Sequence, residues 1–308
     1  MTLLFRSLAS SKSKEFWIGF LLAGLGAVLF SAKAIVVKLT YRYGVDPITI
    51  IGFRMLMSLP FFLAIGWFQS RKARRGEIPR LTVKERWQLV FLGFIGYYLS
   101  SFLDFVGLQY ISAGLERLIL FLSPTFVLLI SGLYFKRAIA GKQWVALAFS
   151  YLGVGFVFLE DLSFSGNKVL FGAACVLVSA ITYAFYLIGS GELIKRVGAT
   201  RLVAYAMSVS AVFTTVQFFW VYSWQGLVQP LPVYQLSVIH AIFNTVLPTF
   251  MIMWSVARIG APMTSQLGLL GPVSVLFLAA WILDEPITTL QLVGTAFVLT
   301  GAVVLGRR

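Results

Sequence analysis

Residues 110–157 read YISAGLERLILFLSPTFVLLISGLYFKRAIAGKQWVALAFSYLGVGFV, and residues 258–305 read RIGAPMTSQLGLLGPVSVLFLAAWILDEPITTLQLVGTAFVLTGAVVL. The two stretches align without a gap at a constant offset of 148 residues. The identical pairs include Pro124 and Pro272, Gln143 and Gln291, and Gly153 and Gly301. Hydrophobic composition alone would produce some apolar matches, but it would not easily produce these three in one register. The chain therefore contains an internal repeat.

Both copies are apolar enough to lie in a lipid bilayer. Of 308 residues, 59% are hydrophobic and 12% are charged, whereas soluble proteins have about 25% charged residues. A helix needs about 20 apolar residues to cross ~30 Å of hydrocarbon. Continuous apolar runs of this length favour helices. We predict ten spans, at residues 16–37, 47–68, 88–108, 113–134, 142–159, 168–189, 200–222, 234–256, 262–281 and 289–306.

The predicted fold class is all-α and integral to the membrane. Five spans fall in residues 1–160 and five in residues 161–308, which are the two predicted repeat domains. Because five is odd, the second repeat must enter the membrane from the opposite side. We therefore expect two inverted five-helix repeats related by a pseudo-two-fold axis in the membrane plane, an arrangement found in many secondary transporters.

The net charge of +14 is concentrated in one alternating set of loops, which holds 19 of the 25 Lys and Arg residues. Basic loops of this kind stay on the cytoplasmic side. We expect both termini to be cytoplasmic, and no nucleic-acid partner, because no loop could house a binding domain. After the fourth and ninth spans, Lys136 and Arg137 match Asp284 and Glu285, so the charge changes sign with the side. All eight Trp residues fall near span ends, as in the aromatic belts of membrane interfaces.

The sequence argues against an enzyme and against a bound metal or cofactor. It has no hydrolase elbow, no metalloprotease motif and no nucleotide-binding motif, and its single histidine cannot build a two-histidine metal site. The lone Cys175 excludes an internal disulfide. A structural membrane protein that transports nothing is the alternative of a different class. The repeat disfavours it, because scaffolding does not need two-fold pseudo-symmetry.

Three prolines within predicted spans are candidates for kinks: Pro124, Pro248 and Pro272. Pro124 and Pro272 are matched in the repeat, and they should free the carbonyl groups of Leu120 and Gly268 and permit kinks. Pro248 should do the same in the eighth span. Proline kinks are common in membrane helices, so hinge, cavity-lining and purely structural roles stay open for Pro124, Pro248, Gly268 and Pro272.

The sequence resembles the drug/metabolite transporter superfamily, EamA type, over nearly its whole length. The resemblance is carried by WSVARIGAPM (254–263), GLLGPV (268–273), LDEPIT (283–288), LQYISAG (108–114), LSPTF (122–126) and Arg54 within FRML (53–56). One departure is the basic pair Lys136-Arg137, where the family usually has Gly-Glu. The resemblance implies ten helices, a central substrate cavity between inverted repeats, alternating access and export of small metabolites across the bacterial inner membrane. Overall likeness points to exporters of aromatic and other amino acids.

By this topology five charged residues lie within the membrane, all in the first repeat: Lys33, Arg54, Asp104, Glu116 and Arg117. Such residues cost about 2.5–3.5 kcal/mol each on insertion scales and are functional candidates by default. They should lie at similar depth in the outer half of the bilayer. We predict an Asp104–Arg117 ion pair or a network that includes Glu116 and Lys33. It would act as a structural salt bridge, an outer gate or a site for a carboxylate, and its surplus positive charge favours an anionic or zwitterionic ligand.

The second repeat offers neutral polar groups instead: Tyr183, Tyr186, His240, Asn244, Ser265 and Gln266. Gln266 lies just before the Gly268–Pro272 interruption, which makes it a candidate for the cavity wall. His240 is either a pH sensor or an interfacial hydrogen-bonding group. In the first repeat, Tyr97, Tyr98 and Ser101 precede Asp104, and we expect Tyr98, Ser101 and Asp104 to share a face toward the cavity.

These features predict a secondary transporter that exports amino acids or similar metabolites by alternating access. Its partners would be the small-molecule substrate and the lipid bilayer. A multidrug exporter and a sugar-phosphate or nucleotide-sugar exchanger of the same superfamily are the alternatives. Proton coupling and oligomeric state do not follow from the sequence.

Overall fold

The computed structural model describes residues 2–135, 141–165 and 168–306. Within these ranges, the side chains of residues 2–13, 134, 135, 164, 165, 192, 260–262, 265, 266, 305 and 306 lie outside the description. The elements are α1 (Thr2–Ser31), α2 (Lys33–Tyr41), α3 (Pro47–Arg74), α4 (Val83–Gly93), η1 (Phe94–Leu99), α5 (Ser100–Leu108), α6 (Ala113–Leu120), α7 (Ser123–Phe135), α8 (Gly141–Ser165), α9 (Lys168–Val197), α10 (Ala199–Tyr222), η2 (Gln225–Leu227), α11 (Leu231–Ala241), η3 (Ile242–Val246), α12 (Leu247–Leu267), α13 (Leu270–Leu278), η4 (Ala279–Leu283) and α14 (Thr289–Gly306). The described chain is thus helical throughout, apart from short connections.

Eight helical runs are long and apolar enough to cross a membrane, and two shorter apolar helices follow them at Leu270–Leu283 and Thr289–Val304. The eight runs correspond to the first eight predicted spans. The predicted ninth span begins at residue 262, whereas α12 is continuous to Leu267. The chain nevertheless reverses within α12, because Ser255 Oγ lies 2.9 Å from Thr264 Oγ1. A straight helix would separate these two residues by about 13.5 Å along its axis.

The elements of the two halves begin at the same offset as the sequence repeat. The segments α4, η1 and α8 begin at residues 83, 94 and 141, and α11, η3 and α14 begin 148 residues later at 231, 242 and 289. Both η1 and η3 are π-helical turns. The duplication therefore extends to the irregular turns and not only to the straight helices.

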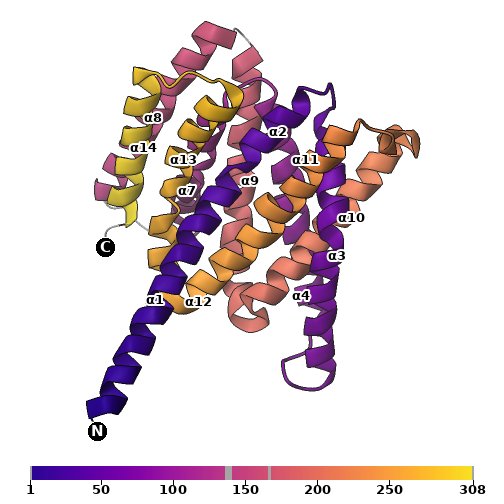
Figure 1. Cartoon of the computed structure of the whole chain (residues 1–308), viewed down its shortest axis with the longest axis vertical. Helices are drawn as coiled ribbons and strands as arrows, with labels where there is room; N and C mark the ends of the chain where they lie inside the picture. Colours follow the sequence, from indigo (N-terminus) through magenta and orange to yellow (C-terminus); the bar gives the residue numbers. More distant parts are fainter. Residues whose placement is uncertain (1, 136–140, 166–167, 307–308) are drawn as a thin grey trace.

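Helices from the two halves pack against one another (Figure 1). Helix α1 lies along α12, α8 lies along α14, and α3 lies along α10. The two glycines at the α8–α14 crossing bring backbones into contact, because a Cβ atom added at Gly153 would lie 2.4 Å from the Gly294 carbonyl oxygen. Small residues permit such close approach where no hydrophobic force drives membrane helices together. Both chain ends lie at the same end of the bundle, which we call the terminal end.

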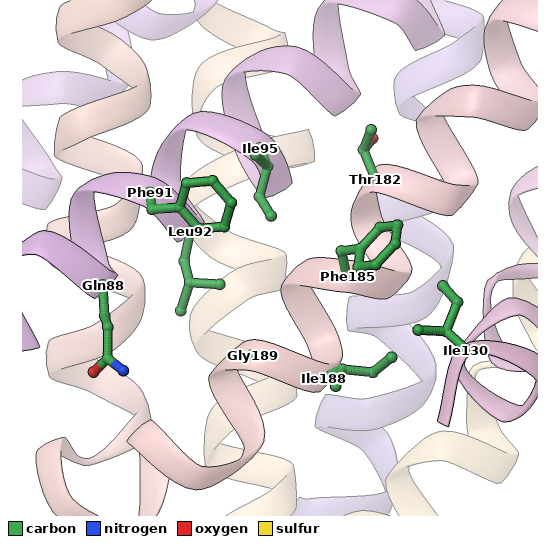
Figure 2. A pocket seen from close by; sticks show the side chains of 9 residues that line it. All are labelled: Gln88, Phe91, Leu92, Ile95, Ile130, Thr182, Phe185, Ile188 and Gly189. Carbon is green, nitrogen blue, oxygen red and sulfur yellow. The ribbon is translucent and has the colours of Figure 1, made fainter. Parts of the chain in front are cut away.

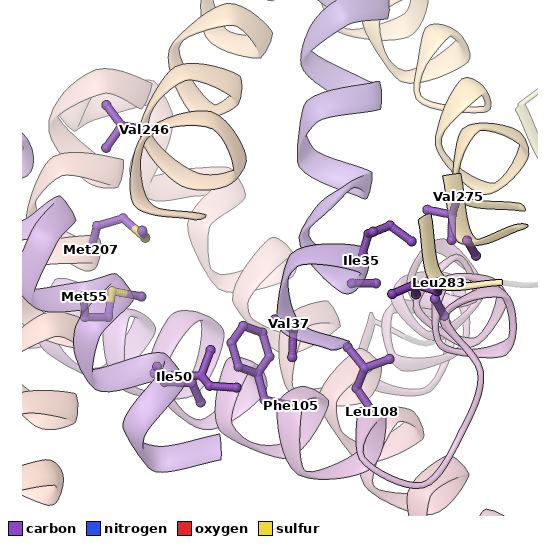
Figure 3. Packing of buried hydrophobic residues seen from close by; sticks show 14 of the residues in the cluster. Ile35, Val37, Ile50, Met55, Phe105, Leu108, Met207, Val246, Val275 and Leu283 are labelled. Atoms are coloured by element: carbon purple, nitrogen blue, oxygen red, sulfur yellow. The ribbon is translucent and has the colours of Figure 1, made fainter. Parts of the chain in front are cut away.

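The opposite end holds the largest buried apolar cluster, which includes Ile35, Ile50, Phe105, Val275 and Leu283 (Figure 3). Its members come from α2, α3, α5, α6, α10, η3, α13 and η4, so both repeats contribute. Met207 of this cluster also lines the central cavity described below.

Candidate functional site

A cavity of about 450 Å³ lies at the centre of the bundle, between the two repeats. Residues of α1, α2, α3, η1, α5, α6, α7, α9, α10, η3 and α12 line it. Lys33, Arg54, Asp104 and Arg117 form its polar end. From there the lining follows α1 back to Ala23 and α12 forward to Val256, toward the terminal end.

Lys33 reaches the cavity because its helix is interrupted directly before it. Helix α1 ends at Ser31 and α2 begins at Lys33. In a continuous helix the Leu29 carbonyl would accept the Lys33 amide. Here Asn244 Nδ2 of the second repeat donates to the Leu29 carbonyl at 2.6 Å. Asn244 also lines the cavity, so one side chain stabilises the break and forms part of the wall.

Two buried carboxylates converge on the Lys33 ammonium. Lys33 Nζ donates to Asp104 Oδ2 and lies 3.2 Å from Glu116 Oε1. The three residues are 8%, 2% and 0% exposed. The sequence offered a direct Asp104–Arg117 pair or a network through Lys33 and Glu116. Lys33, Asp104 and Glu116 meet as the network prediction expected, but Arg117 forms no ion pair with Asp104 among the described residues.

Arg117 faces the interruption of the second repeat instead. Its guanidinium carbon lies 5.7 Å from the Phe30 ring centre. A Cβ atom on Gly271 would lie 2.7 Å from Arg117 Nη2, so this glycine leaves the space that the guanidinium occupies. Glu116 and Arg117 are adjacent on α6, and their side chains therefore contact different partners. Ser112 fixes this turn, because its hydroxyl accepts the Leu115 amide at the start of α6.

Arg54 is held over an aromatic ring. Its guanidinium carbon lies 5.0 Å from the Phe105 ring centre, and the His240 ring stacks on Phe105 at 5.5 Å. His240 is only 1% exposed, and neither ring nitrogen has a hydrogen-bond partner in the described part of the chain. The reading of His240 as an interfacial hydrogen-bonding group is therefore wrong. It is the tenth of the eleven residues of α11, and its buried ring stacks on Phe105.

Tyrosines form one wall of the cavity. Tyr97 and Tyr183 line it, and Tyr186 packs behind them with its hydroxyl 3.2 Å from that of Tyr97. Tyr98 does not face the cavity, contrary to the sequence prediction, because it packs on Phe94 and Phe213. At about 100° per residue, positions 97, 101 and 104 fall within about 60°, whereas 98, 101 and 104 spread over about 120°. The correct face therefore carries Tyr97, Ser101 and Asp104.

The matched positions of the second repeat line the same cavity. Thr245, Thr249 and Ile252 lie 148 residues after Tyr97, Ser101 and Asp104, and both sets line it. Sequence reasoning missed Thr245 and Thr249, although the repeat offset could have found them. It also missed Phe30, Ser100, Phe121 and Ser179. Gln266 lies on α12, but its side chain is outside the described part.

The prolines coincide with interruptions. Helix α6 ends at Leu120 and α7 begins at Ser123, just before Pro124, and Ser123 Oγ donates to the Leu120 carbonyl at 2.6 Å. In the second repeat the Gly268 carbonyl accepts a hydrogen bond from the Gly271 amide at 2.9 Å. Contrary to the prediction, this carbonyl is therefore not left free. Pro124 and Gly268 line the cavity. Pro272 is the third residue of α13, and Pro248 is the second residue of α12, just after η3.

Polar contacts close the end opposite the termini. Lys38 Nζ donates to Glu285 Oε1 at 2.7 Å, and Glu285 Oε2 accepts the Ala113 amide at 3.1 Å. Arg42 donates to the Leu283 carbonyl at 3.1 Å. These contacts join the first repeat to the second above the apolar cluster. Lys136 and Arg137, which match Asp284 and Glu285, lie outside the described residues.

A second hollow of about 510 Å³ is apolar and lies on the outside of the bundle (Figure 2). Phe91 on α4 and Phe185 on α9 flank it, and both are exposed (61% and 48%). Such a groove suits lipid chains, so it is distinct from the polar central cavity. Among the described residues, no group of three His, Cys, Asp or Glu side chains could hold a metal.

A bundle of apolar helices of membrane-crossing length around a polar central cavity defines an integral membrane protein built to admit a small solute. Residues 17–159 and 170–307 each match the EamA-like transporter family, and the chain belongs to that family. It is 29% identical over 307 residues to the uncharacterized transporter YcbK of Bacillus subtilis, covering 96% of each chain. It is 23% identical over 225 residues to the uncharacterized transporter YvbV of Bacillus subtilis, covering 73% of each.

A relative also occurs outside bacteria. An uncharacterized transporter of Archaeoglobus fulgidus is 23% identical over 176 residues, covering 57% of this chain and 58% of its own. A solved crystal structure with a TM-score of 0.60 and 15% identity covers 95% of this chain and 96% of its own, and shows a similar fold. The chain is thus a membrane transporter of the drug/metabolite type.

Proposed function

We propose that this protein is a secondary transporter that exports amino acids, including aromatic ones, or similar zwitterionic metabolites. The observation that carries the proposal is the charge composition of the central cavity. Three cations line it, Lys33, Arg54 and Arg117, whereas Asp104 is its one lining carboxylate among the described residues, and Glu116 is buried beside Lys33 outside the lining. The surplus positive charge in a water-poor site favours a ligand with a carboxylate.

Buried atoms without a hydrogen-bond partner match both charged groups of such a ligand, its carboxylate and its ammonium group. Arg54 Nε and Arg117 Nε are buried and have no hydrogen-bond partner among the described residues, so they can donate to a carboxylate. Asp104 Oδ1 is likewise unpartnered there and can accept from an ammonium group. Phe30, Tyr97 and Tyr183 supply an aromatic wall for the side chain of the substrate. The volume of about 450 Å³ falls within the ~300–1,000 Å³ of small-molecule sites.

We further propose ten membrane crossings in two inverted repeats, residues 1–160 and 161–308, with both termini cytoplasmic in a bacterial inner membrane. The two shorter apolar helices supply the ninth and tenth crossings. The matched starts of α4 and α11, and of α8 and α14, support the repeat. The basic loop between α3 and α4 lies at the terminal end, which the positive-inside rule makes cytoplasmic.

Alternating access then requires two gates. The cavity extends toward the terminal end, and the Lys38–Glu285 pair and the apolar cluster close the other end. In the proposed topology this is an inward-facing state with a closed outer gate. Opening outward would break the Lys38–Glu285 contact, and the interruptions at Ala32, Pro124 and Gly268 are where the helices would bend.

The alternatives within the superfamily fit less well. A multidrug exporter for cations should need an unpaired carboxylate, whereas Asp104 and Glu116 both contact Lys33. A sugar-phosphate or nucleotide-sugar exchanger should have cations in both halves, whereas the described lining from the second repeat is neutral. A structural membrane protein would not need the central cavity.

The test is transport by purified protein in liposomes. Uptake of labelled amino acids is measured with and without a pH gradient, beside an organic cation and a sugar phosphate. Saturable amino-acid flux, lost in Arg54→Gln and kept in the matched control Arg71→Gln at the exposed end of α3, supports the proposal. Flux that follows the pH gradient would add proton coupling. Flux only of the cation or the sugar phosphate would overturn the substrate class.

A further inference from the structure

A second polar pocket, of about 710 Å³, lies at the terminal end between α3, α4 and α10. Four arginines line it: Arg74, Arg80, Arg86 and Arg201. No carboxylate is among its lining residues. The central cavity does not share any of these residues, so the pocket is a separate site.

Arg201 is held in a fixed position in this pocket. It is 4% exposed, and its Nη1 donates to the Pro79 carbonyl at 2.6 Å, which ties the α3–α4 loop to α10. Its guanidinium carbon lies 5.8 Å from the Tyr205 ring centre. Arg201 Nε is buried without a hydrogen-bond partner in the described part of the chain. A donor held this way beside three further guanidinium groups is suited to a phosphate oxygen.

Glu85, which directly precedes Arg86 in the sequence, is already engaged. Glu85 Oε2 accepts the Thr82 amide at 2.8 Å and the Thr82 hydroxyl at 2.9 Å, and Glu85 Oε1 lies 3.1 Å from Arg196 Nε. Arg74, Arg80 and Arg86 make no ion pair among the described residues. The pocket therefore keeps a strong positive charge.

The position of the pocket indicates a lipid. Two exposed tryptophans lie on the helices that form it, as is typical of membrane interfaces: Trp67 is 55% exposed on α3, and Trp87, which directly follows Arg86 on α4, is 70% exposed. The pocket also has apolar lining from Leu81, Leu89 and Val209. Basic pockets between helices at this depth bind anionic lipid head groups.

We propose that this pocket binds the phosphodiester of an anionic phospholipid. Arg74, Arg80 and Arg86 would surround the phosphate, and the buried Arg201 Nε would donate a hydrogen bond to it. The lipid would link α3, α4 and α10 at the terminal end. The proposal does not depend on the identity of the transported substrate.

The test compares two triple variants that remove the same charge from the same loop. The pocket variant is Arg74→Gln/Arg80→Gln/Arg86→Gln, and the control is Lys72→Gln/Arg75→Gln/Lys84→Gln, whose residues are exposed and outside the lining. The melting temperature of the protein in neutral detergent is followed during titration with dioleoylphosphatidylglycerol, dioleoylphosphatidylcholine or inorganic phosphate. Loss of an interfacial cation weakens anionic-lipid binding about fivefold, hence about 100-fold for the pocket variant.

Phosphatidylglycerol should raise the melting temperature of the wild type and the control variant, whereas phosphatidylcholine should not. The single variant Arg86→Gln should show about a fivefold loss even where the triple variant folds poorly. If both triple variants lost the phosphatidylglycerol response equally, surface charge alone would explain the binding, and the proposed lipid site would be wrong. A full response to inorganic phosphate would overturn the lipid assignment in favour of a soluble phosphate.

Discussion

Replacing Lys33 with Met tests how the buried charges are held together. Lys33 is the cation that both Asp104 and Glu116 contact, and the carboxylates are 2% and 0% exposed. Removing one partner of a buried ion pair costs about 3–5 kcal/mol, because the remaining charge stays uncompensated. At about 2 °C per kcal/mol for a chain of this size, the melting temperature should fall by about 6–10 °C.

Thermal unfolding of the purified variants in detergent measures this fall. Lys38→Met is the matched control on the same helix, because Lys38 and Glu285 are 23% and 19% exposed in their side chains. A partly exposed pair contributes about 1 kcal/mol or less, so this control should lose at most ~2 °C. The Lys33→Met/Asp104→Asn variant should recover part of the loss. A fall for Lys33→Met no larger than for Lys38→Met, or no recovery in the double variant, would refute the reasoning.

Three further predictions follow from contacts elsewhere in the bundle. Asn244→Leu removes the only described donor to the carbonyl at the α1 interruption, so the melting temperature should fall by about 2–6 °C, from about 1–3 kcal/mol for an unpaired buried carbonyl. Glu285→Gln weakens the contact to the Ala113 amide, and hydrogen exchange of that amide, read by mass spectrometry, should become faster. Gly294→Leu drives a side chain into a backbone carbonyl at 2.6 Å and should abolish monodisperse elution on size exclusion, whereas Gly155→Leu, which meets nothing within 4 Å, should not.

The sequence predicted the first eight long apolar helices and the meeting of Lys33, Asp104 and Glu116, and the physical reasons are specific. Asp46 caps α3 by accepting the Ile48 and Thr49 amides, directly before Pro47, and the predicted second span begins at this residue. Lys33, Asp104 and Glu116 come together because charges in an apolar bundle are costly unless they meet. Their residue types and approximate depth were enough to predict a network, but not which partner each would take.

Other features have no local signal. The interruption at Ala32 has neither proline nor glycine beside it, since the sequence there reads Ser31-Ala32-Lys33. Asn244, 215 positions away in sequence, satisfies the carbonyl that the interruption leaves free. The choice between Tyr97 and Tyr98 likewise depends on helix rotation, which packing against Phe213 decides. Contacts between distant segments settle both, and single-sequence patterns contain no record of them.

The duplication explains why the cavity is charged on one side only. Glu116 and Leu120 match Thr264 and Gly268 at the repeat offset, and Thr264 and Gly268 line the cavity. The same backbone frame therefore carries ions in the first repeat and hydroxyl groups or no side chain in the second. In the proposed function, the charged wall binds the carboxylate and ammonium groups of the substrate, and the uncharged wall contacts the rest of it. Uncharged contacts of this kind would re-form as the second repeat moves relative to the first in the proposed alternating-access cycle.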